Sequence, residues 1–205
     1  MATRKSKIRQ KADGAYHHGD LKTALKNAAL RLVREKGPRG FSLNEASRLA
    51  GVTVAAPYRH FADKDALLAE IACDGNERMT QTIQEAVSQV SSIKEKMLAS
   101  GMAYLHFCKA HPDYFSVIFH AGLDKSKYPE LERSARAAFN TILDLAHQFE
   151  RTPRLAEQRA VSCWALVHGL ATLTMDGALS TLNRGETEPE RLRSLLEQFL
   201  NQPYK

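Results

Sequence analysis

The chain has 205 residues, of which 43% are hydrophobic and 25% are charged, as in an ordinary globular protein. No apolar run reaches the roughly 20 residues that a helix needs to cross a bilayer, and the basic start lacks the apolar segment of a secretory signal. Three widely spaced cysteines, Cys73, Cys108 and Cys163, fit reduced thiols better than disulfides, so we expect a cytoplasmic protein.

The net charge of +6 is distributed unevenly. Residues 1–72 hold 14 Lys and Arg against 7 Asp and Glu, whereas residues 73–205 hold 15 against 16. Because residues 1–72 are basic and residues 73–205 are nearly neutral, we expect a polyanionic partner for residues 1–72 alone. Charge by itself leaves both DNA and an anionic membrane surface open.

The first residues form a basic, polar arm over 1–15. Its cations are Arg4, Lys5, Lys7, Arg9 and Lys11. Such an arm either reaches along DNA into an adjacent groove or is a disordered tail, and both interpretations stay open. In the following stretch YHHGD, two adjacent histidines are a poor metal site, and we expect phosphate proximity at a helix start instead. Asp20 is predicted to cap the first helix, which Gly37-Pro38 ends.

Two short helices and a turn are predicted next. Ser42, with Glu45 three residues later, forms a capping box for a second helix, and Gly51 occupies the position where a left-handed backbone is wanted. Thr53 is predicted to cap a third helix. Pro57 would be its fourth residue and would delete only the first helical hydrogen bond. Helix, glycine turn and helix together are typical of a helix-turn-helix that places its second helix in a major groove.

Helical periodicity continues almost to the end of the chain. Asp63 is predicted to cap a fourth helix, and later breaks are expected at Gly101, Pro112, residues 122–129, Pro153 and residues 183–189. No strand alternation is evident, so the fold is expected to be all-α. We divide the chain into the arm, a helix-turn-helix domain over 16–72 and a helical ligand-binding and dimerisation domain over 73–205.

The segment FSLNEASRLAGVTVAAPYRHFADKDALL, from Phe41 to Leu68, resembles the TetR family of bacterial transcriptional regulators, and YHHGDLKTALKNAALRLVREKG before it continues the resemblance. That family more often has glycine where Ala55 stands and leucine where Pro57 stands. These departures affect the preferred bases and not the mode of docking. A homodimer on a palindromic operator is expected, because a single helix-turn-helix rarely binds tightly. No phosphate loop, nucleophile elbow or metal-protease motif is evident, so no enzymatic activity and no cofactor are expected.

The resemblance also implies a set of DNA contacts. Hydroxyls and backbone amides at helix starts would contact phosphates, small side chains would face base edges, and the aromatic and basic groups would bind the DNA backbone. The residues are Ser42, Thr53, Val54, Ala55, Ala56, Tyr58, Arg59, His60 and Lys64. Arg59 has an alternative interpretation as a solvated surface residue, and Tyr58 as a core residue. Phe61 is assigned to the core.

In the second part, Trp164, His168 and Gly169 resemble a TetR branch named for its Trp-His-Gly residues. A ligand pocket for a small, largely apolar effector is expected there. Its candidate residues are Tyr104, Phe107, His111, Phe115, Phe119, Trp164, His168 and Met175. A metal site is not expected, because His106, Cys108 and His111 do not share one helix face.

The last helix carries Leu192, Leu195, Leu196, Phe199 and Leu200 on one stripe, which indicates either a dimer interface formed by the last two helices or packing within the chain. A repressor released by its effector is the leading hypothesis. A ligand-independent DNA-bound adaptor on the same fold is the alternative. A membrane-surface protein is disfavoured because no basic amphipathic helix with bulky apolar anchors is evident.

Overall fold

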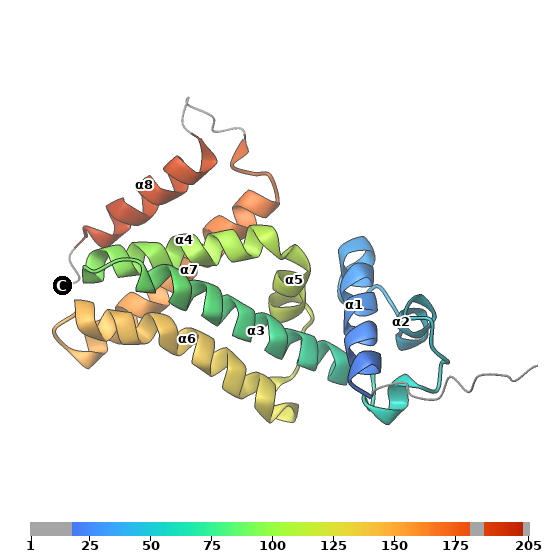
Figure 1. Ribbon diagram of the computed structural model, residues 1–205. Helices are drawn as coiled ribbons and strands as arrows, with labels where there is room; N and C mark the ends of the chain where they lie inside the picture. Colours follow the sequence, from blue (N-terminus) through green and yellow to red (C-terminus); the bar gives the residue numbers. More distant parts are fainter. Residues whose placement is uncertain (1–17, 181–186, 203–205) are drawn as a thin grey trace, which may run out of the picture.

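The computed structural model describes residues 18–180 and 187–202, with the side chains of 18–20 left out, and within these ranges it consists of helices joined by turns and loops, with no strand (Figure 1). The elements are α1 (His18–Lys36), α2 (Leu43–Leu49), η1 (Pro57–Arg59), α3 (Lys64–Ser88), α4 (Ile93–Ala110), α5 (Pro112–His120), η2 (Lys125–Lys127), α6 (Pro129–Phe149), α7 (Pro153–Met175) and α8 (Glu188–Leu200). The all-α prediction is confirmed. The predicted arm lies outside the described residues, as does most of the loop expected at 183–189.

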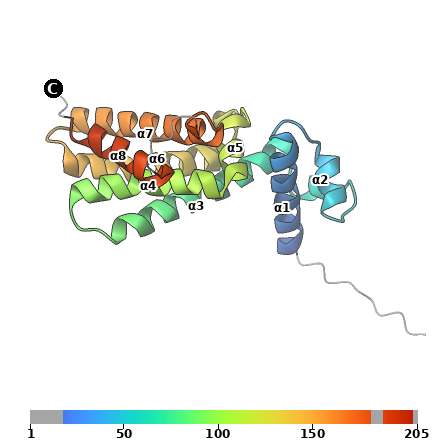
Figure 2. The same cartoon turned by 90° about the horizontal axis from the view of Figure 1, so that it is seen from above.

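The helices form a small module and a larger bundle. Seen from above in Figure 2, α1 and α2 stand at one end, and α3 leads from them into a bundle of α4 to α8. Within the bundle α3 packs against α4 and α6, α7 packs against α4 and α6, and α8 lies on α4. Because α3 runs from residue 64 to residue 88, the expected boundary at residue 72 falls inside a continuous helix. No helix among the described residues is long and apolar enough to cross a membrane.

Helix α5 contributes to both hydrophobic cores. Val117 and Ala121 pack into the first core, which is built mainly from α1, α2 and the start of α3. Phe115 packs into the second core, among residues of α3, α4, α7 and α8. A nine-residue helix therefore joins the small module to the bundle.

Local capping signals are confirmed at several helix ends. Ser42 and Glu45 form the reciprocal capping box of α2, and Asp63 accepts a hydrogen bond from the backbone amide of Ala66 at the start of α3. Gly51 has a φ of +72°, the left-handed conformation that the turn requires. Asp20, however, lies inside α1, which begins two residues earlier at His18, so the predicted cap is wrong.

Gly101 does not interrupt a helix either. It lies within α4, and a Cβ built on it would approach Leu196 Cδ1 to 3.0 Å. The glycine therefore permits the close approach of α8 to α4, and a packing requirement explains the residue that the sequence suggested as a break.

Candidate DNA-binding surface and ligand cavity

The segment that follows the Gly51 turn is not the α-helix that the sequence predicts. Thr53 O accepts a hydrogen bond from the amide of Ala56 at 3.0 Å, and a 3-10 helix follows over Pro57–Arg59. An α-helix beginning at Thr53 would need its carbonyl to accept from residue 57, which is a proline without an N–H. The hydrogen bond that the Thr53 carbonyl cannot accept would be the first of the helix. At that point few other hydrogen bonds stabilise the helix. The segment therefore forms tight turns, and the predicted role of Thr53 as an α-helix cap is wrong.

This segment nevertheless presents small and aromatic side chains to solvent. Thr53, Val54, Ala55 and Arg59 are exposed, and Tyr58 is 57% exposed, so Tyr58 is not a core residue. Ala56 and His60 are half-buried. Phe61 is buried in the first core, as expected. Of the exposed side chains, those of Thr53, Val54 and Ala55 are small, which suits close approach to a groove.

Two predicted phosphate contacts are already engaged within the protein. The hydroxyl of Ser42 accepts from the amide of Glu45 and donates to the Glu45 carboxylate. The pKa of Glu45 is lowered to about 2, first by its hydrogen bond with Lys36 and then by those from Ser42. The ammonium of Lys64 donates to the carbonyls of Phe41 at 3.0 Å and Arg39 at 3.2 Å. An ammonium has three donors, so Lys64 keeps one for a phosphate.

Ion pairs attach the small module to its surroundings. Lys22 and Lys26 on α1 pair with Glu70 and Asp74 on α3, each at 2.6 Å. Two further contacts reach the bundle: Arg34 pairs with Asp113 on α5 at 2.8 Å, and Arg39 donates to the carbonyl of Gly122 at 3.1 Å. The small module is thus tied to α5 and to the loop that follows it.

We expect Arg34→Ala to lower the free energy of unfolding by about 1 to 2 kcal/mol, because it leaves the nearly buried carboxylate of Asp113 without its counter-ion. Asp113 is only 1% exposed. Urea denaturation followed by circular dichroism measures the change. Arg31→Ala is the matched control, since Arg31 is exposed on the same helix and we expect a change within about 0.5 kcal/mol. Equal losses in the two variants would contradict a stabilising role for the Arg34–Asp113 pair.

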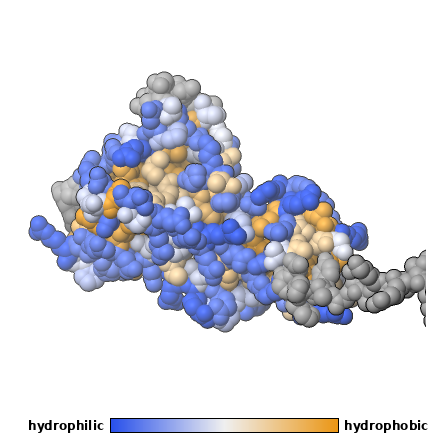
Figure 3. Space-filling view, in the orientation of Figure 1, coloured by the Kyte–Doolittle hydropathy of each residue, from blue (hydrophilic) through white to orange (hydrophobic). Residues whose placement is uncertain are grey.

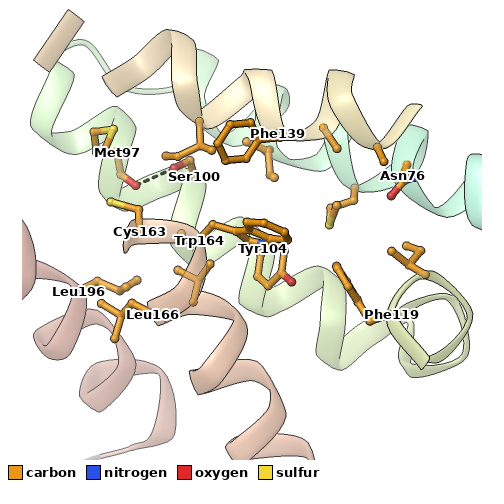
Figure 4. A pocket seen from close by; sticks show the side chains of 18 of the residues that line it. Asn76, Met97, Ser100, Tyr104, Phe119, Phe139, Cys163, Trp164, Leu166 and Leu196 are labelled. Carbon is orange, nitrogen blue, oxygen red and sulfur yellow. Dashed lines mark hydrogen bonds between the residues drawn. The ribbon is translucent and has the colours of Figure 1, made fainter. Parts of the chain in front are cut away.

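The bundle contains an apolar cavity of about 120 Å³ between α3, α4, α5, α6, α7 and α8 (Figure 4). Engineered apolar cavities of roughly 150 Å³ accept benzene-sized ligands, so this volume suits a small organic molecule. Side chains from all six helices line it. The principal lining residues are Met79, Ile83, Met97, Tyr104, Phe119, Phe139, Ile142, Cys163, Trp164, Leu196 and Phe199.

The sequence located this cavity in part. Of the candidates, Tyr104, Phe119 and Trp164 line it. Phe107 and Phe115 are buried in the second core, and Met175 lines a different hollow between α4, α7 and α8. His111 lies at the junction of α4 and α5, outside the lining. The lining residues of α3 and α6 were missed, because their apolar stripes are those of any buried helix face.

His168 lies beside the cavity and not in its lining. Its Nδ1 is 2.9 Å from the hydroxyl of Tyr104, and its ring stacks on Phe115 with the centroids 5.4 Å apart. Burial, followed by the charge of His120, lowers the pKa of His168, and burial raises the pKa of Tyr104. The hydrogen bond therefore joins Tyr104 in the cavity lining to His168 behind it. Across the described ranges, no group of three His, Cys, Asp or Glu side chains is arranged to hold a metal ion.

Comparison with known proteins gives two family matches. The model described as "Bacterial regulatory proteins, tetR family" matches residues 25–71, and the model "Tetracyclin repressor-like, C-terminal domain" matches residues 97–199. The second match covers half of the chain, and the Trp-His-Gly branch suggested by the sequence stays a prediction. No curated protein matches the chain.

Solved structures share the fold. A protein of unknown function from Rhodococcus sp. RHA1 is 27% identical, with a TM-score of 0.78 over 92% of this chain and 97% of that one. A putative tetR family transcription regulator from Shewanella sp. PV-4 is 19% identical, with a TM-score of 0.68 over 87% and 95%. The TetR family transcriptional regulator PfmR from Thermus thermophilus is 16% identical, with a TM-score of 0.61 over 88% and 99%.

Proposed function

The chain belongs to the TetR family of bacterial regulatory proteins, and from that premise we propose that it is a homodimeric repressor whose DNA affinity falls when a small, largely apolar effector binds. The observation that carries the proposal is the exposed, small-residue segment at 53–60 on a basic helix-turn-helix module, joined by α5 to a bundle with an apolar cavity. The proposed units are an arm over 1–15, a DNA-binding domain over 16–72 and an effector and dimerisation domain over 73–205. It would act in the cytoplasm, on the nucleoid when bound to DNA, and without enzymatic activity.

The route from effector to DNA would pass through α5. Ile118 and Phe119 line the cavity, whereas Val117 on the same helix and Ala121 directly after it pack in the core of the small module. A ligand that displaces the first pair would shift the second pair and the Arg34–Asp113 contact with them. The ligand need only favour the displaced conformer to lower the population that fits the operator.

Support for a dimer comes from apolar side chains left exposed on the last two helices. Trp164 is 44% exposed on α7, where Val161 and Leu173 are also exposed, and Leu195 is exposed on α8. Gly169, between them on α7, has no atom within 4 Å of a built Cβ, which leaves room for another helix. Figure 3 shows further apolar residues in the angle between α8 and α4. A two-fold partner would cover the α7 face and match a palindromic operator.

We expect the double substitution Val161→Glu and Leu173→Glu to convert the dimer into monomers, because four carboxylates would meet in an apolar contact. Analytical ultracentrifugation measures the oligomeric state. Ala137→Glu, on an exposed position of α6, is the control and should leave the dimer intact. A double variant that stays dimeric would place the interface on another face.

Fluorescence anisotropy with the DNA immediately upstream of the gene tests the function directly. Measured at two salt concentrations and with excess unrelated duplex, specific binding should persist under competition. Binding that vanishes with the competitor and tracks salt alone would indicate only backbone attraction, against a specific operator on that fragment. Specific binding that no ligand changes would favour the adaptor alternative.

A further inference from the structure

The cavity is long and narrow along three helices. Its lining runs from Asn76 to Ile83 on α3, from Met97 to Tyr104 on α4 and from Ala135 to Ile142 on α6. The ends of each of these three ranges lie seven residues apart, a separation over which an α-helix rises about 10 Å. All three helices therefore give the channel a length of about 10 Å. A slender chain fits this shape better than a compact ring system.

The two ends of the channel differ in polarity. Figure 4 shows Met97, Cys163 and Leu196 at one end and Asn76 with Phe119 at the other. Near the first end, the hydroxyl of Ser100 donates to the carbonyl of Met97 at 2.7 Å, so this end is effectively apolar. At the other end the amide of Asn76 donates to the hydroxyl of Ser134 at 3.0 Å.

Of the residues that the structure describes, a single charged side chain lines the channel, and it belongs to the polar end. Lys125 lies on η2, which packs against the start of α6, the helix that carries Ser134. Within residues 18–180 and 187–202, no ion pair or hydrogen bond engages its ammonium. Lys127, two residues later, does not line the cavity and pairs with Asp124 at 3.8 Å. Lys125 is exposed, so its ammonium would hold an anion with the modest strength of a solvent-exposed ion pair.

We propose that the cavity binds an elongated apolar anion, a medium-chain carboxylate, with its chain along α3, α4 and α6 and its carboxylate at Lys125. This inference deepens the proposed function, on which it rests, by naming the chemical class of the effector. The apolar chain would contribute most of the affinity, because its surface leaves water. Lys125 would set the orientation and discriminate against neutral and cationic head groups.

The chain provides its own probe for this test. Trp164 is the single tryptophan of the protein and lines the channel, so its fluorescence should report occupancy. The full-length protein is titrated with octanoate, octanol and octylamine, which share the chain and differ in charge. Octanoate should bind about fivefold more tightly than octanol, the gain of one solvent-exposed ion pair, and octylamine should bind more weakly than both. The preference for octanoate should shrink in high salt.

Substitutions at Lys125 and Lys127 distinguish an ion pair between octanoate and Lys125 from attraction of octanoate to surface lysines in general. Lys125→Met should remove the preference for octanoate over octanol while octanol affinity is unchanged, and Lys127→Met should preserve the preference. Equal binding of octanoate and octanol by the unmodified protein, or a preference that survives Lys125→Met, would overturn the assignment of Lys125. No response of Trp164 to any of the three would overturn the elongated ligand class. Operator binding is measured without these ligands, so it stands or fails separately.

Discussion

Ala55→Glu should lower the affinity for specific DNA at least roughly a hundredfold, because one carboxylate per subunit would face phosphates and base edges without a partner. Ala55 is exposed in the segment after the Gly51 turn, where nothing in the described structure needs its side chain. Folding should therefore be unaffected. Fluorescence anisotropy on the operator, with circular dichroism as a check on folding, measures the effect.

Ala137→Glu is the matched control for charge, since it adds the same carboxylate at an exposed position on α6, far along the chain from the turn. It should bind the operator within about twofold of the unmodified protein, because the added carboxylate lies on the bundle and not in the segment at 53–60. If both variants lost affinity equally, net charge and not the segment at 53–60 would govern DNA binding.

Arg159→Ala should cost about 3 kcal/mol of unfolding free energy, the largest loss that we expect from a single substitution in the bundle. Arg159 is 2% exposed on α7, and its guanidinium contacts Glu150 at 2.6 Å, next to the end of α6. It also donates to the carbonyl of Gln202 at 3.2 Å and lies 5.1 Å from the centroid of the Phe149 ring. Its removal would leave the Glu150 carboxylate without its buried counter-ion.

Urea denaturation measures this loss of unfolding free energy. Two further variants test whether the buried ion pair causes it. Arg193→Ala removes an exposed pair with Glu197 and should change the unfolding free energy by at most about 0.5 kcal/mol. Adding Glu150→Gln to Arg159→Ala should recover part of the stability, since no uncompensated charge then remains. A loss no larger than that of Arg193→Ala would contradict a structural role for the buried pair.

Capping was predictable from the sequence because it depends on residues only a few positions apart. Ser42 with Glu45, Asp63 and Gly51 all act within one helical turn, and the structure confirms each. Pro57 was misjudged by the same local logic. The sequence predicts that Pro57 removes only one hydrogen bond from the helix that would begin at Thr53. A helix as short as this one depends on its first turn to nucleate, and the segment adopts tight turns instead.

The cavity depends on contacts between distant segments. The apolar stripes of α3 and α6 predict buried faces, but which part of a face lines the cavity is decided by how six helices pack around it. Lys125 in a polar loop and Arg159 in a helix both resemble solvated charges in the sequence. Lys125 shares the cavity lining with Asn76, and Arg159 donates to the carbonyl of Gln202, in each case a residue far along the chain.

Selection of bound duplexes from a random library, followed by sequencing, tests the central claim most directly. Repressor-like DNA recognition predicts enrichment of one inverted repeat, with half-sites about one helical turn apart and loss of the enrichment in Ala55→Glu. Bound duplexes that share no motif, with affinity set by salt alone, would contradict specific recognition by this protein.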